Sequence, residues 1–292
     1  MHQWAGVNPI SEIAREEPFP LPTRLQSSKP YLGFKRVSLA FGSNQILDDV
    51  SFGVFPGETV CILGRSGVGK SVCLRILMGF LKPDSGRVIA AGEDITDYSE
   101  EELQRIRKKV TLVFQNGALF DSLTIGENVA FPLRERGDFT EGEIYQRVDG
   151  LLELLRISPL RDSLPSDLST GMKRSVAIAR ALATQPQAIL YDEPTTMVDP
   201  PTERFLTDLI GNLKIRLHLT SVVVSHDIRL VEKIADHVVF LDRAKVVFRG
   251  TVAEMERSVE PVVQQFLKLD RISLQALEVL AAPAGTPIAR AS

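Results

Sequence analysis

The sequence predicts an α/β fold with a mainly parallel core sheet, an antiparallel side sheet and an inserted helical subdomain. Beyond residue 110, short apolar runs alternate with helical segments, which is the pattern of parallel strands joined by crossover helices. Before residue 100, strand-like runs are bounded by turns, as in an antiparallel sheet. A stretch with helical periodicity lies between the first two apolar runs and predicts the separate subdomain.

The amino-terminal part predicts an arm followed by the side sheet. Residues 1–32 contain several prolines and little periodicity, so we expect a poorly ordered arm. The strand candidates that follow are Lys35–Phe41, Ser51–Phe55 and Arg87–Ala90, the last after a turn at residues 82–86. We expect these strands to lie beside the main sheet in a domain of residues 33–250.

A glycine-rich loop stands between the strand candidate Thr59–Leu63 and the helix candidate Ser71–Met78. Its spacing is G-x-x-x-x-G-K-[ST], and the glycines let successive backbone N–H groups turn toward one phosphate at the helix N-terminus. Lys70 is placed to reach the β and γ phosphates, and the Ser71 hydroxyl to complete the shell of a Mg²⁺ ion. The expected nucleotide-binding residues of this loop are Gly64, Ser66, Gly67, Val68, Gly69, Lys70 and Ser71.

The parallel core sheet is predicted from apolar runs further along the chain. These strand candidates are Val110–Phe114, Ala188–Tyr191, Ser221–Val224 and Val238–Leu241. The segment between the first two, about 117–170, is mostly helical. Because its helix at Glu143–Arg156 carries apolar residues at helical spacing, we expect it to pack as a lobe of its own.

Two acids follow the strand candidate Ala188–Tyr191 and supply the second half of the nucleotide chemistry. The carboxyl ends of parallel strands border the phosphate crevice, so Asp192 is placed to hold Mg²⁺ directly or through water. Glu193, one residue further out, faces the γ phosphate and is the candidate that orients and deprotonates the attacking water. The loop and the acids together predict a nucleotide-hydrolysing enzyme.

Composition and charge argue against several other classes. The chain has 292 residues, 44% of them hydrophobic and 24% charged, which excludes disorder for most of it. Its net charge of −3 gives no electrostatic footprint for nucleic acid, which we do not expect as a partner. Cys61 and Cys73 are expected to be buried and free. With no bilayer-spanning run and no signal-like N-terminus, a cytoplasmic chain is expected.

Further motifs resemble those of the ABC-type ATPases. Leu168–Met172 (LSTGM) is similar to the LSGGQ signature and precedes the acidic strand, as in that family. Gln115 matches the Q-loop, Asp199 the D-loop aspartate and His226 the switch histidine. The resemblance covers roughly residues 34–250 and implies a P-loop NTPase of the ABC type, with ATP and Mg²⁺ as cofactors.

The resemblance also implies a mechanism. ABC ATPases sandwich two ATP molecules between two domains, so Ser169 and Gly171 would bind the γ phosphate held by a second copy of this chain. The exposed N–H groups at the start of their helix suit that task. His226 would contact the phosphate of its own subunit, and Gln115 would touch Mg²⁺ or the lytic water.

Other positions match the family pattern less fully. Phe41 stands where the family places the aromatic ring that stacks on adenine, and Asp199 would belong to the nucleotide site with Val198 in place of the usual leucine. Thr170 replaces the first glycine of the signature. Because a β-branched residue tolerates positive φ poorly, we expect ordinary backbone there and slow hydrolysis.

The segment after Gln115 resembles the ATPase of the Mla/MCE lipid-transport systems. The similarity lies in residues 114–120 (FQNGALF), 127–135 (ENVAFPLRE), 171–172 and 261–267 (PVVQQFL). In ABC transporters this segment borders the groove that receives the coupling helix of the permease. Leu119 and Phe120 are then either partner contacts or core residues of the helical lobe, and composition does not separate the two.

We therefore expect an ATP-hydrolysing motor subunit that dimerises with itself on the cytoplasmic face of an inner-membrane permease. By resemblance, the permease is MlaE-like, an MCE-domain lipid-binding protein acts indirectly, and the cargo is a phospholipid or another hydrophobic lipid. The alternatives are an importer ATPase for a polar solute such as an amino acid, a soluble ABC ATPase acting on ribosomes or DNA, and a regulatory nucleotide-binding module. Residues 251–292 predict a helical extension that clasps the neighbouring subunit or folds back on its own domain.

Overall fold

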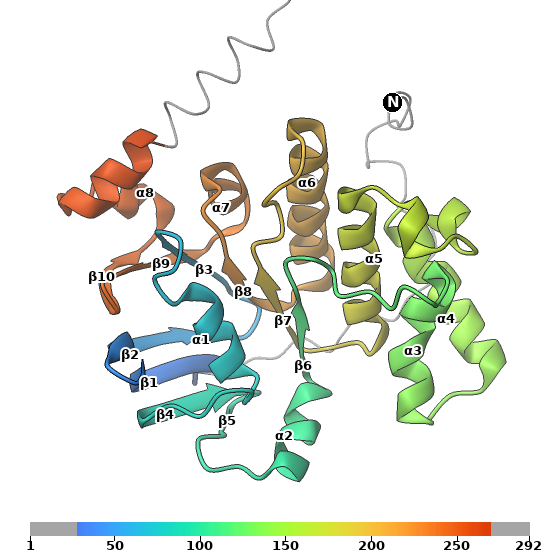
Figure 1. Cartoon of the computed structure of the whole chain (residues 1–292), viewed down its shortest axis with the longest axis horizontal. Helices are drawn as coiled ribbons and strands as arrows, with labels where there is room; N and C mark the ends of the chain where they lie inside the picture. The colour runs from blue at the N-terminus through green and yellow to red at the C-terminus, as the bar shows by residue number, and fades with distance from the viewer. Residues whose placement is uncertain (1–27, 270–292) are drawn as a thin grey trace, which may run out of the picture.

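The structure, a computed structural model, describes residues 28–269. Two sheets form its centre, and a helical lobe stands at the opposite end from β10 (Figure 1). The predicted arm and tail fall largely on residues 1–27 and 270–292, which lie outside the described residues. We expected the arm to reach residue 32, but Tyr31 and Leu32 are buried. The Tyr31 hydroxyl donates to Gln187 Oε1 at 2.6 Å, so order begins before the predicted boundary.

The core sheet has six strands in the order β10-β9-β3-β8-β7-β6. Their bounds are β3 Thr59–Gly64, β6 Val110–Val113, β7 Ala188–Asp192, β8 Thr220–Val224, β9 His237–Asp242 and β10 Lys245–Gly250. All pairings are parallel except that of β10 with β9 at the edge. The mainly parallel sheet is thus confirmed, with an antiparallel edge strand that the apolar pattern did not predict.

The side sheet is antiparallel, as predicted, with the order β2-β1-β4-β5. Its strands are β1 Leu32–Phe41, β2 Asn44–Val54, β4 Ser85–Ala90 and β5 Glu93–Asp94. The strand β2 begins at Asn44 rather than at Ser51, because the hairpin pairing with β1 continues to Phe41 opposite Asn44. Its first two residues, Asn44 and Gln45, are exposed and polar, and the acidic pair Asp48–Asp49 interrupts the apolar pattern before Ser51.

Helices cover the core sheet and fill the space beside the side sheet. They are α1 Lys70–Leu77, α2 Glu100–Arg107, α6 Pro200–Leu217, α7 Ile228–Ile234 and α8 Val252–Glu256. The short helix α1 contacts β4 of the side sheet as well as β3, β7 and β8 of the core sheet. Among the helices of residues 28–269, none is long and apolar enough to cross a membrane.

The helical lobe contains α3 Ile125–Arg136 and α4 Glu141–Leu154, followed by the short turns η2 Ser158–Leu160 and η3 Pro165–Asp167. The helix α5, Thr170–Ala183, packs against α3 and α4 but also contacts β6 and α6 (Figure 1). One hydrophobic cluster therefore runs from the lobe into the core. Through α5, the lobe is connected to β6, the neighbour of the strand β7 that ends in the acidic residues.

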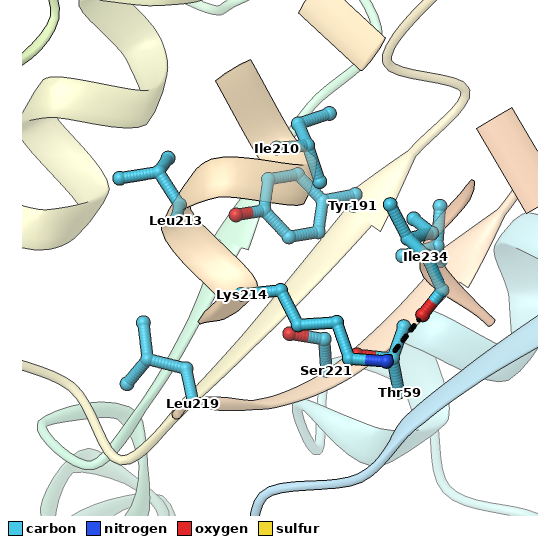
Figure 2. A pocket seen from close by; sticks show the side chains of 9 residues that line it. Thr59, Tyr191, Ile210, Leu213, Lys214, Leu219, Ser221 and Ile234 are labelled. Atoms are coloured by element: carbon cyan, nitrogen blue, oxygen red, sulfur yellow. Dashed lines mark hydrogen bonds between the residues drawn. The ribbon is translucent and has the colours of Figure 1, made fainter. Parts of the chain in front are cut away.

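A small enclosed cavity lies in the core beside α6 (Figure 2). Its volume is about 10 Å³, and Thr59, Tyr191, Lys214 and Ser221 contribute polar atoms to its wall. Lys214 Nζ donates to the Ile234 carbonyl at 2.7 Å, as the dashed line in Figure 2 shows. Since this volume holds about one water molecule, the cavity is excluded as a nucleotide site.

The carboxyl-terminal extension folds back on its own domain as far as the structure describes it. Residues 261–269 are helical, and Val263 and Leu267 from this segment are buried in the core. The Phe266 ring packs edge-on against Phe240, with ring centroids 5.1 Å apart. Residues 251–269 thus pack on their own domain, one of the two predicted arrangements, whereas the rest of the extension lies outside the described residues.

Candidate nucleotide site

The glycine loop joins β3 to α1 in the conformation that a phosphate cradle needs. Gly67 and Gly69 have φ angles of 79° and 104°, which L side chains rarely adopt. A Cβ at Gly69 would lie 3.0 Å from the Ile46 carbonyl oxygen, and one at Gly64 would lie 2.3 Å from that of Leu241. The loop is therefore seated tightly on β2 and β9, with room only for glycine at these contacts.

Lys70 is the buried cation of the site, with only 6% of its surface exposed. Its Nζ donates to the carbonyl oxygens of Gly64 at 2.9 Å and Arg65 at 3.1 Å and lies 3.5 Å from Glu193 Oε1. Removing an ammonium from water is costly unless anions and acceptors surround it. The ammonium is thus held at the mouth of the loop, beside the predicted catalytic carboxylate.

Ser71 and Asp192, the predicted metal ligands of α1 and β7, meet directly. Ser71 Oγ donates to Asp192 Oδ1 at 2.7 Å. Burial raises the pKa of the Asp192 carboxyl, and the Ser71 hydrogen bond partly opposes this rise. Hydroxyl and carboxylate oxygens suit Mg²⁺. Residues 28–269 contain no group of three or more His, Cys, Asp or Glu able to hold a metal, so Mg²⁺ here would take its other ligands from phosphate and water.

Glu193 and His226, from the ends of β7 and β8, also come together. His226 Nδ1 lies 2.8 Å from Glu193 Oε2, and Thr196 Oγ1 donates to the same oxygen at 2.8 Å. Burial alone would raise the pKa of the Glu193 carboxyl, but these hydrogen bonds and the charge of Lys70 lower it below the usual value. The hydrogen bond to Glu193 raises the pKa of the His226 imidazole.

Lys70, Ser71, Glu193 and His226 line one open cavity of about 490 Å³, whereas Asp192 is not part of its lining and is joined to it through Ser71. Its wall also contains Gln115, which follows β6, so the predicted Q-loop residue faces the same space as Glu193 and His226. The size falls in the range of small-molecule sites, and the polar groups converge at one end as a bound anion requires. The arrangement can bind a phosphate chain and place a carboxylate base beside it.

Five predicted nucleotide contacts lie outside the lining of this cavity: Phe41, Val68, Ser169, Gly171 and Asp199. Val68 is half-buried against the core, whereas Phe41 is 52% exposed at the end of β1. Ser169 caps α5, where its Oγ accepts from the Met172 N–H at 3.3 Å. The nucleotide contacts of these positions, like those of the residues that line the cavity, remain predictions.

Thr202 connects the signature to the D-loop. The carboxylate of Asp199 caps α6 by accepting from the Thr202 N–H at 3.1 Å and from its hydroxyl at 2.7 Å. A Cβ at Gly171 would lie 2.1 Å from Thr202 Cγ2, so only glycine permits this packing of α5 on α6. Thr170 is the first residue of α5, with helical backbone that accommodates a β-branched side chain.

Residues from the carboxyl-terminal segment join the site, which the sequence did not predict. Phe266 lines the cavity, and Gln265 Oε1 accepts from Arg65 Nη2 of the glycine loop at 2.9 Å. These contacts join positions far apart in the chain, and no local pattern signals them. The apolar spacing around Phe266 indicated a helix but not the surface that it covers.

Leu119 and Phe120, which could be either core residues or partner contacts, differ in their burial. Leu119 is half-buried and packs against the core, as a structural residue would. Phe120 is 43% exposed and stacks with the exposed Phe131 of α3, with ring centroids 4.6 Å apart. Asn128 fixes the backbone on either side, since its amide bonds both the N–H and the carbonyl of Phe120. The aromatic pair Phe120–Phe131 therefore lies on the surface of the lobe.

Saturation with Mg-ATP is expected to stabilise the protein. At about 100 times the dissociation constant, ligand binding to the folded state alone adds ~2.7 kcal/mol to the free energy of unfolding. Chemical denaturation with and without Mg-ATP measures this difference, and Mg²⁺ alone is the control. An unchanged midpoint at saturating nucleotide would contradict the site.

Comparison with known proteins gives a consistent result. The family model described as "ABC transporter" matches residues 47–196. The methionine import ATP-binding protein MetN of Geobacillus kaustophilus is 40% identical over 230 residues, 78% of this chain and 67% of that protein. The intermembrane phospholipid transport system ATP-binding protein MlaF of Escherichia coli K12 is 38% identical over 242 residues, 83% of this chain and 90% of that protein. The probable ribonucleotide transport ATP-binding protein mkl of Mycobacterium leprae is 37% identical over 238 residues, 82% of this chain and 69% of that protein.

Solved structures agree in fold. The dimeric structure of a post-hydrolysis state of the ATP-binding cassette MJ0796, bound to ADP and Pi, has a TM-score of 0.69 and 32% identity and covers 76% of this chain and 98% of its own. The structure of cbiO1 from Clostridium perfringens, part of the ABC transporter complex cbiONQ, has a TM-score of 0.73 and 29% identity and covers 86% of this chain and 100% of its own. The glycine loop, the acidic strand end and the helical lobe are thus parts of one known architecture.

Proposed function

Because the chain belongs to the ABC transporter family and is its ATP-hydrolysing subunit, we propose that it works as a Mg²⁺-dependent homodimer driving lipid transport. The cargo is a phospholipid or another hydrophobic lipid, moved by an MlaE-like inner-membrane permease on whose cytoplasmic face the dimer docks. An MCE-domain lipid-binding protein takes part through the permease.

The observation that carries the lipid assignment is the extent of the match to MlaF. The two chains correspond over 90% of MlaF, whereas the match to MetN leaves about a third of that protein without a counterpart. An ATPase that matches MlaF nearly from end to end can use the same contacts with its transport partners. Percentage identity alone does not discriminate, since MetN is the slightly more similar of the two.

The homodimer is supported by the distribution of site residues in one chain. Lys70, Ser71, Glu193 and His226 share a cavity, but Ser169 and Gly171 of the signature lie outside its lining. Ser169 is exposed at the start of α5, where free N–H groups and the helix dipole favour an anion. The phosphate bound there would come from the cavity of a second copy, and the relative MJ0796, solved with ADP and Pi bound, is dimeric.

The chemistry assigned to this chain's own residues follows from their positions. The loop N–H groups and Lys70 bind and orient the phosphates, and Ser71 and Asp192 would hold Mg²⁺, which neutralises phosphate charge when bound. The Glu193 carboxylate accepts a proton from the attacking water. His226, which is hydrogen-bonded to Glu193, lines the same cavity and would contact the same phosphate.

The exposed pair Phe120–Phe131 supports permease docking. Aromatic side chains are enriched at the cores of protein interfaces and depleted on free surfaces. Arg180 lies with its guanidinium 5.8 Å from the Phe120 ring and donates to the carbonyls of Gly117 and Ala118, so the segment is held rigidly. Because Phe120 follows Gln115 closely in the chain, a rigid aromatic patch here can transmit permease contacts to the nucleotide cavity.

Phe120→Asp is expected to uncouple the permease while leaving ATP-dependent dimerisation intact. A charge in a buried aromatic contact costs several kcal/mol, enough to weaken docking by about 100-fold or more. Permease-stimulated ATPase activity and copurification with the permease measure this loss. The matched control is Phe80→Asp, since Phe80 is 47% exposed and stacks with Arg107 away from the lobe. A misfolded Phe120 variant would instead support a core role.

The second candidate function is import of a polar solute such as an amino acid, which the 40% identity to MetN favours. The two are separated by reconstituting the ATPase with its permease in liposomes. Lipid transport predicts ATP-dependent transfer of fluorescent phospholipid to or from an MCE-domain protein and no uptake of amino acids. Uptake of a polar solute without phospholipid transfer would overturn the lipid assignment.

A further inference from the structure

Arg174 is a buried arginine on α5 that the predicted motifs do not include. It is 4% exposed, and its guanidinium points into the turn that follows β7. Arg174 Nη1 donates to the Glu193 carbonyl at 2.8 Å and to the Pro194 carbonyl, and Arg174 Nη2 donates to the Thr196 carbonyl. One side chain of the signature helix therefore binds three carbonyls of the segment that carries the catalytic carboxylate.

The turn that Arg174 binds has an unusual backbone. Glu193 has a φ of 48° and Met197 a φ of 60°, both in the left-handed region that non-glycine residues occupy at a cost. Such conformations persist where surrounding contacts impose them. Arg174 provides three such contacts at one point, because its planar fork matches carbonyls that face the same direction.

The other end of Arg174 is anchored beside the signature. Gly171 lies one helical turn before it, packed against Thr202, and Ser175 Oγ donates to the Gly171 carbonyl at 3.2 Å. A displacement of the first turn of α5 would therefore move the guanidinium and the three carbonyls with it. The side chain of Glu193 extends from the same peptide unit into the nucleotide cavity.

We propose that Arg174 is a positioning residue that sets the Glu193 carboxylate in its own site and couples it to the signature at the start of α5. The inference rests on the homodimer of the proposed function, in which a phosphate held by the partner binds at Ser169 and Gly171. Phosphate binding there fixes the first turn of α5. Arg174, through its hydrogen bonds to the turn after β7, then fixes the position of the Glu193 carboxylate. Arg174 itself does not contact the nucleotide cavity.

The burial of the Arg174 guanidinium supports a role beyond stabilising the fold. Burial is the main influence on Arg174 and lowers its pKa, and the nearby Glu193 charge opposes this. Its Nε is buried without a partner among the described residues. An arginine that anchored only the fold could be replaced at lower cost by an apolar side chain of similar length, since buried charges are often neutral or unfavourable for stability.

The test compares Arg174→Met and Arg174→Lys in the full-length protein. We expect the dissociation constant for fluorescent ATP to stay within about twofold, because the glycine loop, Lys70 and Ser71 are untouched. The kcat of ATP hydrolysis should fall about 100-fold in Arg174→Met, the cost of misplacing a catalytic group by about 1 Å. Arg174→Lys should recover part of this, because an ammonium binds fewer of the carbonyls.

Two controls keep the outcomes distinct. Arg147→Met removes an arginine that stacks on Phe139 at 4.3 Å in the helical lobe and should leave kcat unchanged. Combining Arg174→Met with Glu193→Gln should still give an ATP-trapped dimer. A kcat within about twofold of wild type in Arg174→Met, or equal losses in kcat and ATP affinity in both Arg174 variants, would overturn the inference. Loss of the dimer in Glu193→Gln alone would instead contradict the proposed function.

Discussion

Glu193→Gln is expected to reduce ATP turnover by about 100-fold or more, the range that a general base contributes. The amide has nearly the shape of the carboxylate but does not accept the proton of the attacking water. ATP binding should persist, because Lys70 Nζ keeps its hydrogen bonds to the Gly64 and Arg65 carbonyls. Phosphate release and fluorescent ATP titration measure the two effects separately.

A surface carboxylate provides the matched control for this variant. Glu100 pairs with Arg107 on α2, away from the nucleotide cavity, so Glu100→Gln should hydrolyse ATP at the wild-type rate. If Glu193→Gln kept the wild-type rate as well, Glu193 would no longer be a tenable base. Another group lining the cavity would then have to accept the proton.

Lys70→Ala is expected to weaken ATP binding by about 10- to 100-fold. Hydrogen bonds to charged groups contribute roughly 1.5–3 kcal/mol, and the ammonium is held in place before the ligand binds. Removing it also leaves Glu193 without the cation at 3.5 Å. Isothermal titration calorimetry with Mg-ATP gives the affinity directly.

Lys82→Ala serves as the control for Lys70→Ala. Lys82 is an exposed lysine paired with Asp97, outside the cavity, and its loss should leave the affinity unchanged. Thermal unfolding without nucleotide shows whether Lys70→Ala is folded. A folded Lys70→Ala protein that binds Mg-ATP like the wild type would remove Lys70 from the site.

The site could be predicted wherever its chemistry is encoded in a short segment. The loop from Gly64 to Ser71 requires glycines at fixed spacing, and Asp192 and Glu193 follow an apolar strand, so local sequence indicates both. Their meeting in space follows from the parallel order of β3, β8 and β7. The structure brings together Ser71 and Asp192, the two predicted metal ligands, and it also pairs His226 with Glu193, a contact that the motifs did not specify.

Contacts between distant segments could not be predicted in the same way. Phe266 reaches the cavity because residues 261–269 pack on β9, and an amphipathic pattern does not say which surface a helix covers. In the sequence, Arg174 is indistinguishable from a basic residue on an exposed helix face. Only the structure shows that its guanidinium binds the turn after β7. The hairpin start at Asn44 was missed because pairing with β1, and not hydrophobicity, extends the strand.

The central claim is that ATP is bound between two copies of this chain, and the molar mass of Glu193→Gln tests it most directly. Multi-angle light scattering after size-exclusion chromatography should give the dimer mass with Mg-ATP and the monomer mass without nucleotide, with Lys70→Ala monomeric in both. A monomer mass for Glu193→Gln at saturating Mg-ATP, both alone and in the presence of the permease, would contradict the account.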